Sequence, residues 1–251
     1  MLLAAAPWDG GPMGTGTDWH DPVNWGADEL PGVDDDVEIG PEFAAITISS
    51  GSNVSVNKLT SEAAIRMTGG TFALANDSML TELTFSGGTL TGTGDVTVTD
   101  TLTWSSGTMT GAGKTVLAPG ASGTISGTGY PGADKYLGRT LENAGTIDYT
   151  GQSLHFGTYA GAAGVIDNLA TGRFNVTGEG DFDVYIAPGP HAFNNAGTFT
   201  KSSDGTTSFS GVAFSSTGSL QVQAGTLDLT GSIAVDGNSY FASQPSTTAL
   251  G

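Results

Sequence analysis

The 251-residue sequence contains no cysteine, which excludes disulfide bonds and thiolate metal sites. Basic residues are scarce, because seven lysines and arginines stand against 25 acidic residues and leave a formal net charge of -18. A surface of this charge repels a nucleic-acid duplex and an anionic membrane, so we expect no nucleic-acid partner. Acidity of this degree suits a protein secreted into salty or calcium-rich water.

Long apolar runs and long helical patterns are also missing. The apolar run at residues 2–7 is too short for a signal peptide or a membrane span, and we expect no membrane insertion. The best helical candidate, residues 59–67, is short and rich in threonine and serine. His20, His155 and His191 lack the spacing of metal ligands, so we interpret them as capping or surface histidines.

What the sequence does contain is a repeated three-residue cue: a glycine, then a small or polar residue, then an apolar one. Successive cues are separated by 18, 19, 16, 22, 27, 25 and 21 residues. A repeat near twenty residues that varies in length is typical of the coils of a β-solenoid, because strands keep their length while corners accept insertions. The cue begins at Gly70, Gly88, Gly107, Gly123, Gly145, Gly172, Gly197 and Gly218.

The residues around the cues support this fold. Val96, Val98, Leu102 and Trp104 alternate with threonines, which predicts a strand with one buried face and a buried Trp104. Asparagines precede three of the glycines, at Asn143, Asn168 and Asn195, and such residues stack as ladders at solenoid corners. A β-sandwich would also show short, regularly spaced strands. The same cue recurs along the chain, and we interpret it as the same corner in successive coils. This favours the solenoid over the sandwich.

The segment before the repeats reads W-x-D-P-x-N-W from Trp19 to Trp25 and P-G-x-D-D-x-V-x-I from Pro31 to Ile39. It resembles the segment that opens repeat regions in large bacterial surface proteins of the haemagglutinin and autotransporter-like kind. The resemblance implies a capped, right-handed parallel β-helix displayed outside the cell. The bulky rings of Trp19 and Trp25 are themselves expected to lie over the exposed first coil.

Three regions follow from these observations. Residues 1–44 are expected to form a leader remnant and cap, residues 45–232 a single-stranded parallel β-helix of eight to ten coils, and residues 233–251 a tail or truncated edge. The run at residues 2–7 resembles the end of an export sequence in planctomycete-type surface proteins. We therefore expect the natural chain to be longer.

Carboxylates form the candidate metal sites. Asp34, Asp35 and Asp36 place several hard oxygens in one turn, and Asp181 and Asp183 alternate along one strand. Such ligands suit calcium. The alternative is a solvated acidic turn in the first case and an outward strand face in the second.

Catalysis by a β-helix of the polysaccharide-lyase kind needs a cation acting as base or neutralising group. Lys135 and Arg139, with Tyr130 and Tyr136, form the one local cluster of this sort, in a stretch that interrupts the regular spacing. They are the catalytic candidates. A structural insertion at a corner is the alternative interpretation.

Exposed aromatic rings suggest carbohydrate binding, because they stack on the apolar faces of sugars. The main candidates for a carbohydrate-binding site are Trp8, Tyr130 and Tyr136. Further candidates are Trp104, Tyr149, Tyr159 and Tyr185. Threonine pairs such as Thr89 and Thr91 resemble the flat ladders of ice-binding solenoids, although Asp148, Asn175 and Asp228 interrupt the array.

The sequence thus predicts a non-catalytic, secreted or cell-surface solenoid with a structural or adhesive role, whose partner is a polysaccharide or another cell surface. The alternatives are a carbohydrate-binding or polysaccharide-cleaving β-helix and an ice-binding threonine face.

Overall fold

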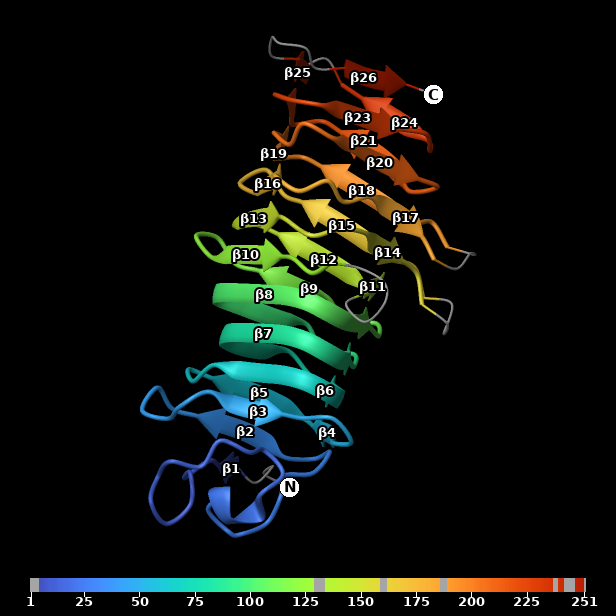
Figure 1. The fold of residues 1–251 in the computed structure, drawn as a ribbon. Coiled ribbons are helices and arrows are strands. Elements are labelled where there is room, and N and C mark those ends of the chain that lie inside the picture. Colours follow the sequence, from blue (N-terminus) through green and yellow to red (C-terminus); the bar gives the residue numbers. More distant parts are fainter. Residues whose placement is uncertain are drawn as a thin grey trace.

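The computed structural model describes residues 5–128, 134–158, 162–185, 189–236, 239–241 and 247–250. It shows a parallel β-solenoid of about nine turns, in which one chain winds from the N-terminal end of a rod to the C-terminal end (Figure 1). Within the described residues, the one helix is the short 3-10 helix η1 (Pro22–Asn24). The predicted solenoid is confirmed.

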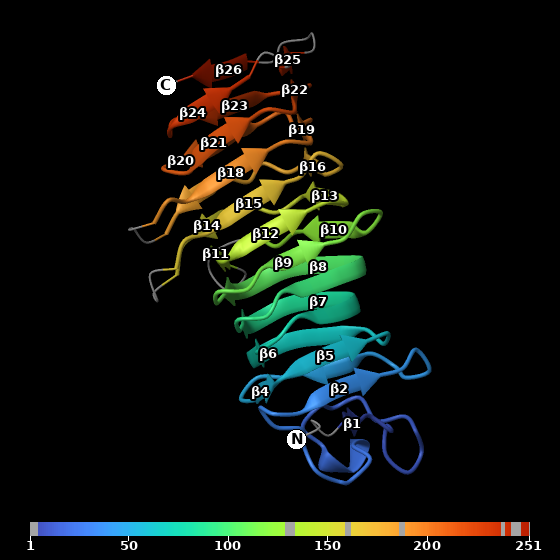
Figure 2. The same ribbon diagram turned by 180° about the vertical axis from the view of Figure 1, so that it is seen from behind.

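Each turn contributes one strand, or one part of a long strand, to each of three sheets along the rod (Figures 1 and 2). The first sheet contains β1 (Ala5–Pro7), β2 (Asp36–Ile39), β5 (Lys58–Ser61), β9 (Thr115–Leu117), β12 (Thr140–Asn143), β15 (Val165–Asn168), β18 (Ala192–Asn195), β21 (Ala213–Ser216) and β24 (Ile233–Val235). The second contains β3 (Ile46–Ile48), β10 (Ser122–Ile125), β13 (Thr146–Tyr149), β16 (Arg173–Val176), β19 (Thr198–Lys201), β22 (Ser219–Val222) and β25 (Ser239–Phe241).

The third sheet contains β4 (Asn53–Val56), β11 (Lys135–Gly138), β14 (Leu154–Phe156), β17 (Phe182–Val184), β20 (Thr206–Ser210), β23 (Thr226–Leu229) and β26 (Thr247–Leu250). Three long strands bend around corners and so belong to more than one sheet: β6 (Ile65–Leu74), β7 (Ser78–Thr91) and β8 (Val96–Thr110). All pairings between named strands are parallel, so each layer hydrogen-bonds only to the layers before and after it.

Apolar and polar side chains alternate along the strands, and the apolar ones form the core. In β8, Val96, Val98, Leu102 and Trp104 are fully buried, while the threonines between them are partly or fully exposed. The Trp104 ring stacks on Phe85 of the preceding layer, with 6.2 Å between ring centroids. The predicted burial of Trp104 is therefore confirmed, and the inward side chains of successive layers form one continuous column.

The cue glycines occupy two different corners, and this corrects the single-corner interpretation. Gly70, Gly88 and Gly107 precede the third sheet, because the residues after them pair in register. The cues at 145, 172, 197 and 218 precede the second sheet instead. Gly123 lies inside β10 and faces the core, where a Cβ would come within 2.9 Å of Ile147.

Close approach of the layers requires glycine at both corners, and the first corner adds a constraint on the backbone. At the first corner the backbone is left-handed, with φ of 88° at Gly88, a conformation that costs other residues energy. At the second corner φ is not positive, but the layers approach closely. A Cβ on Gly197 would lie 2.2 Å from the carbonyl oxygen of Gly172 in the layer below.

Two alanine substitutions separate these effects. Gly120 has φ of 84° with no atom within 4 Å of a new Cβ, whereas a Cβ on Gly88 would lie 2.5 Å from the Gly70 carbonyl oxygen. We expect Gly120→Ala to cost about 1–2 kcal/mol from backbone strain alone. Gly88→Ala should cost about 1–3 kcal/mol more, because layers must move apart. Urea unfolding measures both, and equal losses would contradict close approach as the cause.

The predicted asparagine ladder is present at the corner between the first and second sheets. The Asn143 side-chain amide donates to Asn168 Oδ1 at 2.8 Å, and Asn168 donates to Asn195 Oδ1 at 2.7 Å. Asn195 continues the ladder to Ser216 Oγ at 2.9 Å. All four side chains are buried, so each satisfies polar groups that water cannot reach.

The N-terminal segment covers the first coil. The Trp19 backbone N–H donates to the Thr47 carbonyl oxygen of β3 at 3.1 Å, and β1 pairs with β2. Trp8, Trp19 and Trp25 are buried and pack edge to face, and Trp19 reaches Phe72 in the core with 5.9 Å between ring centroids. The indoles thus keep water from the open end of the column, as predicted for Trp19 and Trp25.

Candidate functional site

The outward face of the third sheet carries a column of polar and aromatic side chains. Tyr136 of β11 pairs in register with His155 of β14, which pairs with Asp183 of β17. Because side chains alternate along a strand, the neighbours of these three residues point inward and hold their strands in the core. Those neighbours are Lys135, Leu137, Leu154, Phe156 and Phe182, all fully buried, and Val184, which packs against the core.

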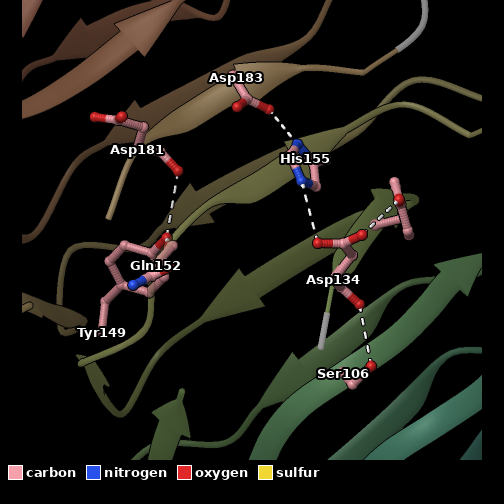
Figure 3. A network of polar contacts seen from close by, with 8 residues as sticks. Ser106, Asp134, Tyr149, Gln152, His155, Asp181 and Asp183 are labelled. Atoms are coloured by element: carbon pink, nitrogen blue, oxygen red, sulfur yellow. Dashed lines mark hydrogen bonds and ion pairs between the residues drawn. The ribbon is translucent and has the colours of Figure 1, made fainter. Parts of the chain in front are cut away.

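His155 lies between two carboxylates (Figure 3). Its Nδ1 contacts Asp183 Oδ1, and its Nε2 lies 3.8 Å from Asp134 Oδ1. The side chains of His155, Asp134 and Asp183 are 19%, 15% and 33% exposed, so solvent reaches the group only from outside the rod. The Ser106 hydroxyl donates to the Asp134 carbonyl oxygen at 3.2 Å and fixes the start of the strand.

Two tyrosines complete the group. The Tyr136 ring stacks on the His155 imidazole with 5.2 Å between centroids, and Tyr185 meets Tyr136 edge-on at 4.6 Å. Tyr185 is 36% exposed and follows β17 directly. We call the residues Asp134, Tyr136, His155, Asp183 and Tyr185 the third-sheet cluster.

Tyr136 acts as a hydrogen-bond donor in this cluster. Its hydroxyl donates to Asp134 Oδ2 at 3.2 Å. Burial raises the pKa of the Tyr136 phenol, and the negative charge of Asp134 raises that pKa further. The phenol therefore stays protonated, so it can orient a ligand but does not serve as a base at neutral pH.

The carboxylates predicted to bind calcium have other partners. Asp35 Oδ2 accepts the Gly32 N–H at 2.8 Å, and Asp36 Oδ1 accepts from the Asn57 amide at 2.6 Å. Asp34 is exposed. Among the residues that the structure describes, no three histidines or carboxylates are grouped so that they could hold a metal ion.

Asp181 and Asp183 also have separate roles (Figure 3). Asp181 Oδ1 accepts the Ser208 N–H of the next layer at 2.8 Å, and its carbonyl oxygen lies 3.3 Å from the Tyr149 hydroxyl. Tyr149 also contacts the Gln152 carbonyl oxygen and is fully buried. Asp181 thus joins two layers, whereas Asp183 belongs to the third-sheet cluster.

Both catalytic candidates lie inside the solenoid, which corrects their expected placement. Arg139 is 2% exposed, and its guanidinium donates to the carbonyl oxygens of Thr110, Gly94 and Lys114 at 3.3, 3.2 and 2.5 Å. Burial lowers the pKa of Arg139 to about 10. Lys135 is fully buried because the outward place on β11 belongs to Tyr136. Neither side chain reaches a ligand outside the rod.

The aromatic candidates for carbohydrate binding divide into outward-facing and buried side chains. Tyr136 and Tyr185 face outward in the third-sheet cluster, whereas Trp8 is 3% exposed and packs against Trp25, so its ring is closed to a sugar. Tyr149 is buried as well. Tyr130 and Tyr159 lie outside the described residues.

Sequence reasoning missed His155 and Asp134 as members of a site. A signal was present: the triplets Lys-Tyr-Leu, Leu-His-Phe and Phe-Asp-Val each place one outward residue between two inward ones. Aligning these triplets by their inward positions brings Tyr136, His155 and Asp183 into one column.

Comparisons of the chain with protein-family models, curated proteins and solved structures found no match. Within the described residues, no helix has the length and apolar character needed to cross a membrane.

Proposed function

We propose that this chain is a non-catalytic adhesive rod, displayed outside the cell, that binds carbohydrate through the third-sheet cluster. The observation that carries the proposal is the gathering of Tyr136, His155 and Tyr185 around two carboxylates on an outward face. Among the side chains that the structure describes, this is the only place where several aromatic rings lie together at the surface.

The chemistry of the cluster suits a sugar. Tyrosine rings bury the apolar C–H face of a pyranose, and neighbouring carboxylates accept hydrogen bonds from its hydroxyls. The cluster stands on three paired strands with buried neighbours, so little side-chain entropy is lost on binding. A rigid platform of this kind suits adhesion, which requires binding without turnover.

The placement of the cations supports a binding role over cleavage. A lyase needs a lysine or arginine near the bound sugar, but Lys135 and Arg139 lie inside the solenoid. We expect no unsaturated product when the protein is incubated with acidic polysaccharides. The interrupted threonine array also favours carbohydrate binding over ice binding. In the next layer Thr108 pairs with Tyr136 and Thr110 with Gly138, so the flat threonine ladder ends there.

Removing the Tyr136 ring tests the proposal. We expect Tyr136→Ala to weaken glycan binding at least tenfold, which corresponds to about 1.4 kcal/mol, because the sugar loses its stacking surface. Isothermal titration with the glycans selected on an array measures the change. Tyr136→Phe keeps the ring and should retain most of the affinity.

Thr108→Ala is the matched control, since Thr108 is the outward neighbour of Tyr136 on the same sheet. Thermal melting of all three variants checks that the solenoid remains folded. If Tyr136→Ala and Thr108→Ala bind with the affinity of the unmodified protein, the third-sheet cluster is not the binding site.

A further inference from the structure

The outward side chains of the third-sheet cluster carry more negative than positive charge. Asp134 and Asp183 contribute two carboxylates, and His155 between them adds at most one positive charge, so the outward side chains of the cluster carry a net negative charge in either protonation state of the imidazole. Asp134 Oδ1 is buried and has no hydrogen-bond partner among the described residues, although His155 Nε2 lies 3.8 Å away. The buried oxygen contributes negative charge, whereas the Asp183 side chain, which is 33% exposed, offers a carboxylate that a ligand can reach.

None of the chain's seven lysines and arginines lies on the outward face of the third sheet, although the buried Lys135 ammonium attracts Asp134 from inside the solenoid. Lys135, Arg139 and Lys201 are buried, and the Lys201 ammonium donates to the carbonyl and hydroxyl oxygens of Ser203 at 2.6 and 2.8 Å. Lys114 pairs with Glu142 of the first sheet at 2.9 Å. The others lie on strands of the first and second sheets: Lys58 on β5, Arg66 on β6 and Arg173 on β16.

We propose, building on the function proposed above, that the third-sheet cluster selects glycans that carry free, protonated amino groups. An ammonium group donates a charge-assisted hydrogen bond to Asp183, is attracted by the charge of Asp134, and makes a cation–π contact with the face of Tyr136 or Tyr185. A uronate places its carboxylate against two others and is repelled. An N-acetylated sugar can stack on the rings but lacks the charge.

Three hexasaccharides of matched length test this selectivity: β-1,4-linked glucosamine, β-1,4-linked N-acetylglucosamine and α-1,4-linked galacturonate. Titrations are run below the pKa of the sugar amine, at low and at high salt. We expect the glucosamine hexamer to bind at least tenfold tighter than the acetylated hexamer and the galacturonate to bind weakest. High salt should reduce the difference, because it screens the charge contribution.

Asp134→Asn removes one negative charge with little change of shape and should reduce the preference for glucosamine several-fold while the acetylated hexamer binds as before. The matched control is Asp148→Asn, on the second sheet, where Asp148 accepts a hydrogen bond from Asn175 at 2.9 Å. This variant should keep the full preference, and thermal melting verifies that both variants are folded.

The outcomes distinguish the two proposals. If the acetylated and free-amine hexamers bind equally, or galacturonate binds best, selectivity for cationic sugars is wrong while carbohydrate binding stands. Equal loss of preference in Asp134→Asn and Asp148→Asn also overturns the inference, because it would trace selectivity to the net charge of the protein. If no glycan binds, carbohydrate binding itself is wrong.

Discussion

Replacing Lys135 by methionine is expected to stabilise the protein by about 3 kcal/mol at neutral pH. Lys135 is fully buried, and its ammonium has no hydrogen-bond partner among the described residues. Burial lowers the pKa of Lys135 from 10.5 to about 8, although the nearby Asp134 opposes the shift. The folded state therefore carries a poorly solvated charge that methionine, of similar length, removes.

The pH dependence has a definite sign. Between about pH 8 and pH 10.5 the unfolded chain holds a proton on Lys135 that the folded chain has released. The free energy of unfolding therefore rises with pH across this window, and the cost of the buried charge is fully present below it. The gain from Lys135→Met should be largest near pH 7 and shrink as the pH approaches 10.

Urea unfolding of the unmodified protein and Lys135→Met at several pH values between about 7 and 10 measures this difference. Lys58→Met is the matched control, because Lys58 is exposed on β5 and its removal relieves no buried charge. Destabilisation by Lys135→Met at pH 7, or a gain that does not vary with pH, would refute the explanation.

The second large effect is expected from Phe193→Ala, which should lower the free energy of unfolding by about 3–5 kcal/mol. The Phe193 ring lies 5.0 Å from Phe174, 5.4 Å from Phe199 and 5.6 Å from Phe209 and Phe214, between ring centroids. Alanine leaves a cavity that the neighbouring aromatic rings cannot fill, since paired strands hold them in place.

The loss should be local at first, because each layer contacts only its neighbours. Hydrogen exchange is expected to accelerate from β15 onward while β6 to β8 keep their protection. Thr200→Ala, on the outward face of β19, is the control and should change the free energy of unfolding by less than about 0.5 kcal/mol. Uniform loss of protection along the rod would contradict this account.

The solenoid could be predicted because it depends on local patterns that repeat. Alternation of Val96, Val98, Leu102 and Trp104 with threonines predicts a strand with one buried face, and the asparagines predict the ladder. The prediction of a single corner was wrong because the same glycine cue occurs at two corners with different structural requirements. At Gly88 glycine permits a left-handed backbone as well as close approach of the layers, whereas at Gly197 it permits close approach alone, and sequence alone does not distinguish the two cases.

The site could be predicted only in part. Tyr136 and Tyr185 were expected as possible sugar platforms, but their meeting with His155 depends on register between coils of unequal length. His155 and Asp183 pair across an interval of 28 residues, whereas Tyr136 and His155 pair across 19. Lys135 shows a second reason why the site could not be fully predicted. Side chains alternate along β11, so the outward orientation of Tyr136 makes Lys135 point inward, although charged side chains usually face water.

The pairing of layer with layer has a mechanical consequence. The hydrogen bonds of all three sheets run along the long axis of the rod, so a force pulling its ends apart loads first those of the terminal layer. Coils then detach one after another, and each detached coil of about 20 residues adds about 70 Å of extended chain. A solenoid built in this way yields stepwise under tension, one coil at a time.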